Sequence, residues 1–354
     1  MLVPPLVFEA AFHLNLAELR RSLPTLMLMA IPGVVITMLV VGGIVAWGAA
    51  LALPVALVFG ALIAATDPVA VIALFRAVGA PKQLVVPVEG ESLLNDGTAI
   101  VIFNLMLAVA LTGHFNLMEG LVEFIRVAAG GLGVGLALGW LAAQLIARVD
   151  DYAIETALTL VLAFGAYLVA EHFHVSGVLA VVAAGLVSGN LGLRGMSQTT
   201  RVGLFHFWEF AAFIANSLVF LLIGLQVNGS QLTVMWPQIA WAIVAVLTAR
   251  VLVVYGLGRI TKRLGEPIPS SWQPVLSWGG LRGAISLALA LSLPEALGPA
   301  RPVLLAMTFG VVLFTLLVQG TTMGALVRGL GLNPRPAHSP STTPALDTAE
   351  LAAD

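Results

Sequence analysis

The sequence predicts an all-α polytopic membrane protein. Of its 354 residues, 59% are hydrophobic and only 10% are charged, whereas a soluble domain carries roughly 25% charged residues. The apolar residues gather in runs of about 20, which is the length that a helix needs to span a bilayer. A net charge of -2 and the lack of cysteine argue against nucleic-acid binding, disulfide bonds and thiolate metal sites.

Each apolar run is interpreted as one helix, which gives about eleven membrane spans. The predicted spans are residues 2–13, 23–47, 50–78, 84–112, 119–147, 153–172, 175–191, 205–227, 236–258, 273–296 and 301–327. Residues 1–332 therefore form the transmembrane domain. Residues 333–354 are rich in Pro, Ser, Thr and Ala, a composition that favours a disordered tail.

The basic residues indicate the orientation of the chain. Twelve of the 16 Lys and Arg residues lie in alternate connections between spans, and such connections face the cytoplasm. This pattern places the C-terminus in the cytoplasm. We expect a multi-pass protein of the plasma membrane, specifically of a bacterial inner membrane.

The first span differs from the others. It is short, contains Pro4, Pro5 and Glu9, and begins at the initiator Met1, with no basic segment that would indicate a cleavable signal peptide. Two explanations are open: the chain begins with a short span, or further helices precede it in a longer protein. We favour the second.

The fourth span carries a polar face. Glu91 and Asn95 are spaced i,i+4, as are Ser92 and Asp96, so the four side chains cover two adjoining stripes of one helix. Ionisable groups within a membrane are costly and indicate a functional site by default. We expect this face to be buried and to reach water alternately from the two sides of the membrane.

The third span contains Thr66 and Asp67 directly before Pro68. Proline lacks a backbone donor and disfavours helix at the preceding residue, so the helix should stop near Thr66 and free carbonyl groups beside a carboxylate. Unwound backbone at this depth must line a cavity or be packed in protein. The alternative is a proline kink in which Asp67 caps the next half-helix.

The tenth span contains Gly279, Gly280 and Gly283 around Arg282, which predicts a second interrupted helix. The third and tenth spans run in opposite directions, and two such helices are typical of an inverted-repeat transporter whose site lies where the breaks meet. We expect Arg282 to pair with a carboxylate of the fourth span. The alternatives are helix packing for the glycines and snorkelling for Arg282. Arg250, inside the ninth span, should form a structural ion pair.

The motifs Ala65-Thr66-Asp67-Pro68, Glu91-Ser92-x-x-Asn95-Asp96 and Gly279-Gly280-Leu281-Arg282-Gly283 occur in this order. Together they resemble monovalent cation:proton antiporter family 1, the NhaP-type Na⁺/H⁺ exchangers, from about Pro4 to Leu330. The resemblance implies an antiporter fold with crossed interrupted helices, a homodimer, and about two helices ahead of this chain.

The resemblance also implies roles for single residues. Asp96 would bind the cation and the proton, with Ser92, Thr66 and Asp67 as ligands or water-mediated contacts. Glu91 and Asn95 would meet Arg282 and stabilise the site. A fifth candidate ligand, Glu9, follows from the Phe8-Glu9 pair, which resembles a motif in the family's preceding helix.

The chemistry of these residues favours exchange of monovalent cations for protons. Na⁺ and Li⁺ prefer oxygen ligands, as carboxylates, hydroxyls and carbonyls supply; K⁺ is a further candidate, and no cofactor is expected. Asn95 beside Asp96 leaves one mobile carboxylate charge, which favours an electroneutral cycle. Two other functions stay open: a passive cation channel, and an intramembrane hydrolase using Asp67 and Asp96 as an acid/base pair or Ser92 as nucleophile.

Overall fold

The computed structural model describes residues 2–67, 72, 82–226, 229–261 and 270–332, and in these ranges the regular structure is helical. In chain order the helices are α1 (Val3–His13), α2 (Leu16–Ala30), α3 (Pro32–Gly48), α4 (Leu53–Leu62), α6 (Lys82–Thr112), α7 (Leu117–Ile146), α8 (Tyr152–His172), α9 (Gly177–Asn190), α10 (Gln198–Gln226), α11 (Gly229–Val234), α12 (Trp236–Thr261), α13 (Gln273–Trp278), α14 (Ala284–Leu291), α15 (Ala300–Phe314) and α16 (Thr321–Gly329).

Within the described ranges, seven helical segments are long and apolar enough to cross a membrane. They are Leu16–Gly48, Gly90–Thr112, Leu117–Ile146, Tyr152–His172, Gln198–Leu225, Trp236–Ile260 and Ala300–Gly329. The chain is therefore a multi-pass membrane protein, as predicted. The prediction of a disordered tail at 333–354 lies outside the described residues.

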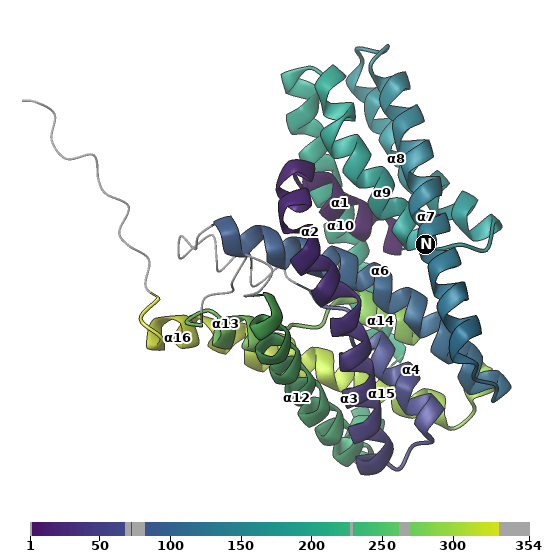
Figure 1. The fold of residues 1–354 in the computed structure, drawn as a ribbon, viewed down its shortest axis with the longest axis vertical. Coiled ribbons are helices and arrows are strands. Elements are labelled where there is room, and N and C mark those ends of the chain that lie inside the picture. Colours follow the sequence, from purple (N-terminus) through teal and green to yellow (C-terminus); the bar gives the residue numbers. More distant parts are fainter. Residues whose placement is uncertain (1, 68–71, 73–81, 227–228, 262–269, 333–354) are drawn as a thin grey trace, which may run out of the picture.

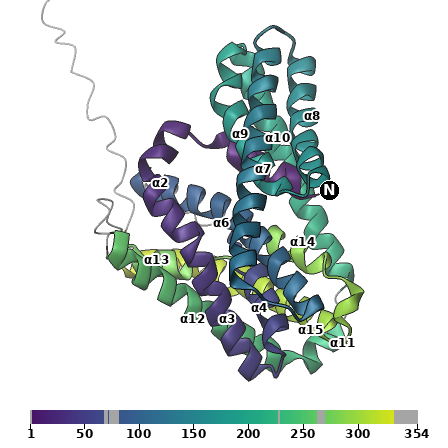
Figure 2. The same cartoon turned by 45° about the vertical axis from the view of Figure 1, so that its right-hand side comes forward.

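The helices form two groups (Figure 1). α7, α8, α9 and α10 lie in one group together with α1, whereas α3, α4, α12 and α15 pack in the other. Turning the molecule keeps this separation (Figure 2). α6 packs against α2 and α4 on one side and against α7 and α9 on the other, so the polar face predicted on this helix lies at the junction of the two groups.

Glycines set the distance between α7 and α9. Gly131, Gly135 and Gly139 occur every fourth residue of α7 and face α9. A Cβ added at Gly135 would lie 2.8 Å from Ala180 Cα, and one at Gly139 would lie 3.1 Å from Ala184 Cα. Since apolar side chains gain little from leaving lipid for a helix interface, close backbone approach through small residues stabilises this pair instead.

Side-chain caps fix several helix starts, because they satisfy backbone N–H groups that have no partner in the first turn. Asn15, Asn116 and Asp151 accept such bonds at the starts of α2, α7 and α8. The cap at Asn15 starts α2 earlier than hydropathy suggests, so Arg20 lies in a helix rather than in the expected loop. Hydropathy identifies the part of a helix that lies in lipid, and it does not detect the polar ends of helices.

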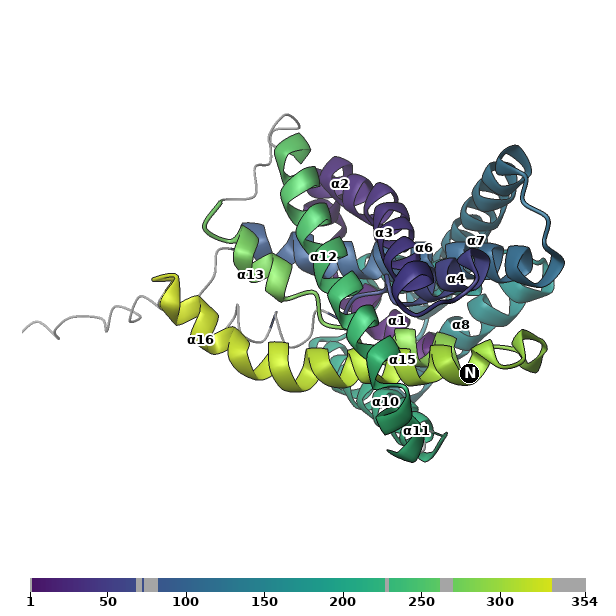
Figure 3. The same ribbon diagram turned by 90° about the horizontal axis from the view of Figure 1, so that it is seen from below.

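In the described residues, helices stop at both predicted places, and the break between α13 and α14 is described on both of its sides. α4 ends at Leu62 and Asp67 is not helical, while Pro68 itself lies outside the described residues. α13 ends at Trp278 and α14 begins at Ala284, which leaves residues 279–283 unwound. Seen from below, α15 and α16 form one long rod, and α13 packs against its α16 end (Figure 3).

That rod contains a feature that the sequence analysis did not predict. Residues Thr315–Gly320 between α15 and α16 form a π-helix. The Thr315 hydroxyl oxygen at its start accepts a hydrogen bond of 3.2 Å from the backbone N–H of Arg282. Since π-turns inside α-helices often occur at functional positions, this irregular segment is notable for lying against the break in the neighbouring helix.

Candidate functional site

The unwound segment after α4 meets the break between α13 and α14. The backbone N–H of Asp67 donates to Leu281 O at 2.9 Å, and the Ser286 hydroxyl lies 3.4 Å from Ala65 O. Both bonds join the segment after α4 to the segment around the break between α13 and α14. The sequence prediction that the site lies where the breaks meet therefore has the expected geometry.

Arg282 stabilises the end of α4. It is 1% exposed, and its Nη1 donates to Ala64 O at 2.9 Å and to Ala65 O at 3.1 Å. Ala64 and Ala65 follow α4, and buried carbonyls of unwound backbone need hydrogen-bond donors from elsewhere in the protein, which the Arg282 guanidinium supplies. Arg282 is thus inside the protein and is not a snorkelling residue.

The polar face of α6 covers the same segment. Ser92 donates from its hydroxyl to Thr66 O at 2.5 Å. Asn95 Nδ2 donates to Ala64 O at 3.0 Å and to Thr66 Oγ1 at 3.2 Å. Carbonyls freed by the break in the third predicted span thus receive hydrogen bonds from α6 and from Arg282, which holds the unwound backbone in one conformation.

Asp96 lies at the centre of this arrangement. It is 8% exposed, it accepts a hydrogen bond from the Thr66 backbone, and it lies within electrostatic range of Asp67 and Arg282. Its Oδ1 atom, like Asn95 Oδ1, is buried without a hydrogen-bond partner among the described residues. A buried oxygen without a partner costs free energy, so this site is suited to a proton or a cation.

Gly283 brings the second interrupted helix against Asp67. A Cβ added at Gly283 would lie 2.8 Å from Asp67 Cγ, a separation at which neither side chain could stay in place. Glycine therefore permits the Asp67 carboxylate to occupy the space beside the backbone of residues 281–283. The spacing of the three glycines predicted the break, but not this contact.

Glu91 forms its close ion pair with Arg250, although Arg282 interacts electrostatically with both Glu91 and Asp96. Glu91 Oε1 forms an ion pair with Arg250 Nη1 at 2.7 Å, while the Arg282 side chain donates to the carbonyls described above. The structural ion pair predicted for Arg250 is thus present, and Glu91 is its partner. Arg250 Nε also donates to Leu276 O of α13 at 3.2 Å, so the pair connects α6, α12 and the first half of the second broken helix.

Glu9 lies beside His13 on α1. On α1 it lies 3.4 Å from His13 Nδ1, and His13 Nε2 lies 3.9 Å from Glu209 Oε1 of α10. These contacts place Glu9 where α1 meets α10, whereas the hydrogen bonds described above at Thr66 come from α6. A role for Glu9 as a ligand stays a prediction.

Thr315 was missed by sequence reasoning. It is 1% exposed and accepts the backbone N–H of Arg282. No pattern distinguishes it from the other threonines in apolar runs, because its role depends on a contact with a segment 33 residues away.

Comparisons with known proteins agree with this geometry. The family described as "Sodium/hydrogen exchanger, transmembrane" matches residues 1–329. The chain is 45% identical over 334 residues to the Na(+)/H(+) antiporter ApNhaP of Aphanothece halophytica, covering 93% of this chain and 64% of the relative. It is 40% identical to the Na(+)/H(+) antiporter NhaH of Halobacillus aidingensis, covering 94% and 82% respectively.

Among solved structures, the sodium proton antiporter MjNhaP1 of Methanocaldococcus jannaschii matches with a TM-score of 0.79 at 24% identity, covering 93% of this chain and 84% of that one. This match shows the antiporter fold. The chain spans 63% to 64% of the length of ApNhaP and of the Bacillus atrophaeus antiporter NhaG. The family match over residues 1–329, the NhaH relationship and the fold all lead to one conclusion: this chain belongs to the sodium/hydrogen exchanger family.

Proposed function

We propose that the chain exchanges Na⁺ or Li⁺ for protons by alternating access at Asp96. One observation supports this most directly: a buried carboxylate with an unpartnered oxygen lies where two interrupted helices meet. A carboxylate in such a place can hold a proton or a cation, and each neutralises it. If only the neutralised site crosses between the two sides, exchange is obligatory.

The cation is surrounded by oxygen atoms in this proposal. Asp96 supplies the charge, and Ser92 and Thr66 supply oxygens from a hydroxyl and from the unwound backbone. Asp67 lies close enough to contribute through water, and Glu9 is the candidate ligand from α1. Hard monovalent cations suit such ligands. K⁺ is the third cation to be tested.

The remaining polar residues hold the site in shape. Arg282 and Asn95 fix the carbonyls at the end of α4, and Glu91 is held by Arg250. Arg282 also keeps positive charge beside Asp96, which disfavours a permanently open cation pore. This last feature argues for the exchanger over the passive channel.

The proposed architecture has about eleven membrane segments. Each segment is either a helix long enough to span the bilayer or an interrupted helix of the kind found in transporters. The interrupted pair is related as an inverted repeat, and one helix group moves relative to the other about α6. The C-terminus faces the cytoplasm of a bacterial inner membrane. Two copies associate as a homodimer, as the resemblance implies.

One assay separates the candidate functions. The chain is expressed in everted membrane vesicles from a host without its own exchangers, a pH gradient is imposed, and Na⁺, Li⁺ or K⁺ is added. An exchanger dissipates the gradient on cation addition, a channel carries current without coupled proton movement, and a hydrolase does neither. Unchanged dye fluorescence with every cation, from vesicles that contain folded protein, would contradict the proposal.

A further inference from the structure

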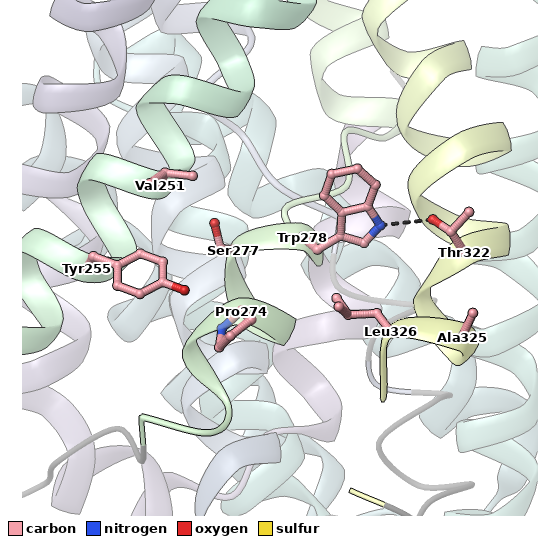
Figure 4. Close-up of a pocket in the computed structure, with 8 residues that line it drawn as sticks. All are labelled: Val251, Tyr255, Pro274, Ser277, Trp278, Thr322, Ala325 and Leu326. Carbon is pink, nitrogen blue, oxygen red and sulfur yellow. Dashed lines mark hydrogen bonds between the residues drawn. The ribbon is translucent and has the colours of Figure 1, made fainter. Parts of the chain in front are cut away.

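A groove lies between α12, α13 and α16, away from the polar face of α6. Its volume is about 660 Å³ and it is lined by Val251, Tyr255, Pro274, Ser277, Trp278, Thr322, Ala325 and Leu326 (Figure 4). This volume lies within the range of small-molecule sites, roughly 300–1,000 Å³. Val251 is 48% exposed, so the groove is open to the surroundings of the protein.

The lining residues come from three helices (Figure 4). α12 contributes Val251 and Tyr255, α13 contributes Trp278 with its neighbours, and α16 contributes Thr322 and Leu326 with theirs. Trp278 Nε1 donates to Thr322 Oγ1 at 3.0 Å, which ties α13 to α16 and satisfies the indole N–H. The groove wall is thus mainly hydrocarbon, and the natural occupant of such a wall in a membrane protein is hydrocarbon.

Positive charge follows the groove-lining residues along α12 and α16. Arg259 is one turn after Tyr255 on α12, which is about 6 Å further along the helix. Arg328 follows Leu326 by two residues at the end of α16, and both arginines are exposed. The sequence around these positions adds Lys262, Arg263 and Arg335 against one acidic residue, Glu266. A hydrophobic groove that ends in exposed arginines is complementary to an amphiphile with a negatively charged head.

We propose that the α12–α13–α16 groove binds one acyl chain of an anionic phospholipid from the surrounding bilayer, with the headgroup at Arg259 and Arg328. Basic pockets between membrane helices recognise anionic headgroups in this way. Lipid in the groove contacts α13, the first half of an interrupted helix. It also contacts Val251, the residue that follows Arg250. The proposal concerns binding alone, so it does not depend on the exchange activity.

The test uses the full chain in bilayer nanodiscs that contain phosphatidylcholine with or without phosphatidylglycerol. A phosphatidylglycerol carrying a photoactivatable group on one acyl chain is cross-linked, and the labelled peptides are identified by mass spectrometry. We expect labels on the α12, α13 and α16 segments that line the groove. Labelling should exceed that by the matching phosphatidylcholine probe.

Two variants distinguish recognition of the lipid headgroup from binding of the acyl chain. Arg259→Gln with Arg328→Gln should reduce groove labelling about fivefold for each arginine, the effect expected for one basic residue at an anionic surface. Ala325→Phe should fill the groove and abolish labelling by both probes. The matched controls are Arg20→Gln with Arg148→Gln, which removes two exposed arginines elsewhere, and Ala137→Phe, which adds a ring on the exposed face of α7; both should label like wild type.

Several results would overturn the proposal. Equal labelling by the two probes would show that the protein does not recognise the anionic headgroup. Unchanged labelling of Ala325→Phe would show that the acyl chain does not bind in the groove. Labelling that appears only after residues 333–354 are deleted would identify the tail, rather than lipid, as the occupant. Labels spread evenly over α7 as well would indicate general contact with the bilayer and no site.

Discussion

Arg250 Nη1 and Glu91 Oε1 lie 2.7 Å apart, and their side chains are only 11% and 14% exposed. Removing Arg250 therefore leaves a mostly buried carboxylate without its charge partner, which costs about 3 kcal/mol for pairs of this kind. We expect Arg250→Ala to lower the thermal unfolding temperature of the purified protein. Adding Glu91→Gln should recover part of the loss, because the uncompensated charge is then gone.

A matched control for that experiment is the exposed pair of α7. Arg126 Nη2 lies 2.6 Å from Glu123 Oε1, with the two side chains 49% and 46% exposed. Solvent screens such pairs, so Arg126→Ala should change the unfolding temperature little. Equal losses in Arg250→Ala and Arg126→Ala, or strict additivity of the two changes at Arg250 and Glu91, would show that the buried pair has no special role.

Asp96 is the residue on which the proposed exchange depends. Asp96→Asn keeps the shape of the side chain but can carry neither a proton nor a neutralising charge for Na⁺. We expect folded mutant protein with exchange at the background level of empty vesicles, measured by dequenching of a ΔpH dye. Asp150→Asn, an exposed carboxylate before α8, is the control and should exchange like wild type. Exchange by Asp96→Asn would reject the assignment.

Thr66 joins the unwound segment to Asn95 through a hydrogen bond of 3.2 Å. Thr66→Ser keeps the hydroxyl, whereas Thr66→Val has nearly the same shape without it. Losing one neutral hydrogen bond costs about 1 kcal/mol, so the valine variant should need about fivefold more Na⁺ for half-maximal exchange. The serine variant should stay close to wild type, and identical behaviour of the two variants would mean that the hydroxyl is not used.

Gly283 lacks the space for a side chain because Asp67 occupies it. Gly283→Ala should displace Asp67 and with it the unwound segment, so exchange should fall strongly while the helices remain. The measurement is the exchange rate per folded molecule after size-exclusion chromatography. Gly256→Ala on α12 is the control, since an added Cβ there meets nothing within 4 Å. A fully active Gly283→Ala would show that the break tolerates another position of Asp67.

The charge of the transported unit sets the response to membrane potential. One carboxylate, Asp96, and a neutral neighbour, Asn95, return one proton for one cation and move no net charge. Clamping the potential with K⁺ and valinomycin should leave the Na⁺/H⁺ rate of the wild type nearly unchanged. Strong acceleration by the potential would mean that more than one proton moves, with Asp67 as the second carrier.

The sequence was sufficient for features that depend on nearby residues. Apolar runs located the long helices, Pro68 and the glycines around Arg282 indicated where helices stop, and the i,i+4 spacing on α6 identified the polar face. Contacts between segments far apart in the sequence could not be predicted from it. Glu91 could pair with any arginine of the core, and its pairing with Arg250, 159 residues away, depends on where the fold places α6 and α12. Hydropathy also left Arg20 outside a helix, because it reports contact with lipid rather than helix formation.

The π-helix at Thr315–Gly320 has a consequence for how this segment tolerates a change in length. A π-turn holds more residues per turn than the α-helix on either side, in the manner of an inserted residue. Deleting one residue between Thr315 and Gly320 would let the rod close into a regular α-helix with α16 facing as it does now. Winding the present residues as an α-helix throughout would instead turn α16 by about 100° relative to α15. Thr322 could no longer accept from Trp278 while Thr315 still accepted from Arg282. The π-turn therefore allows one helix to contact the residue before the break, Trp278, and a residue within the break, Arg282.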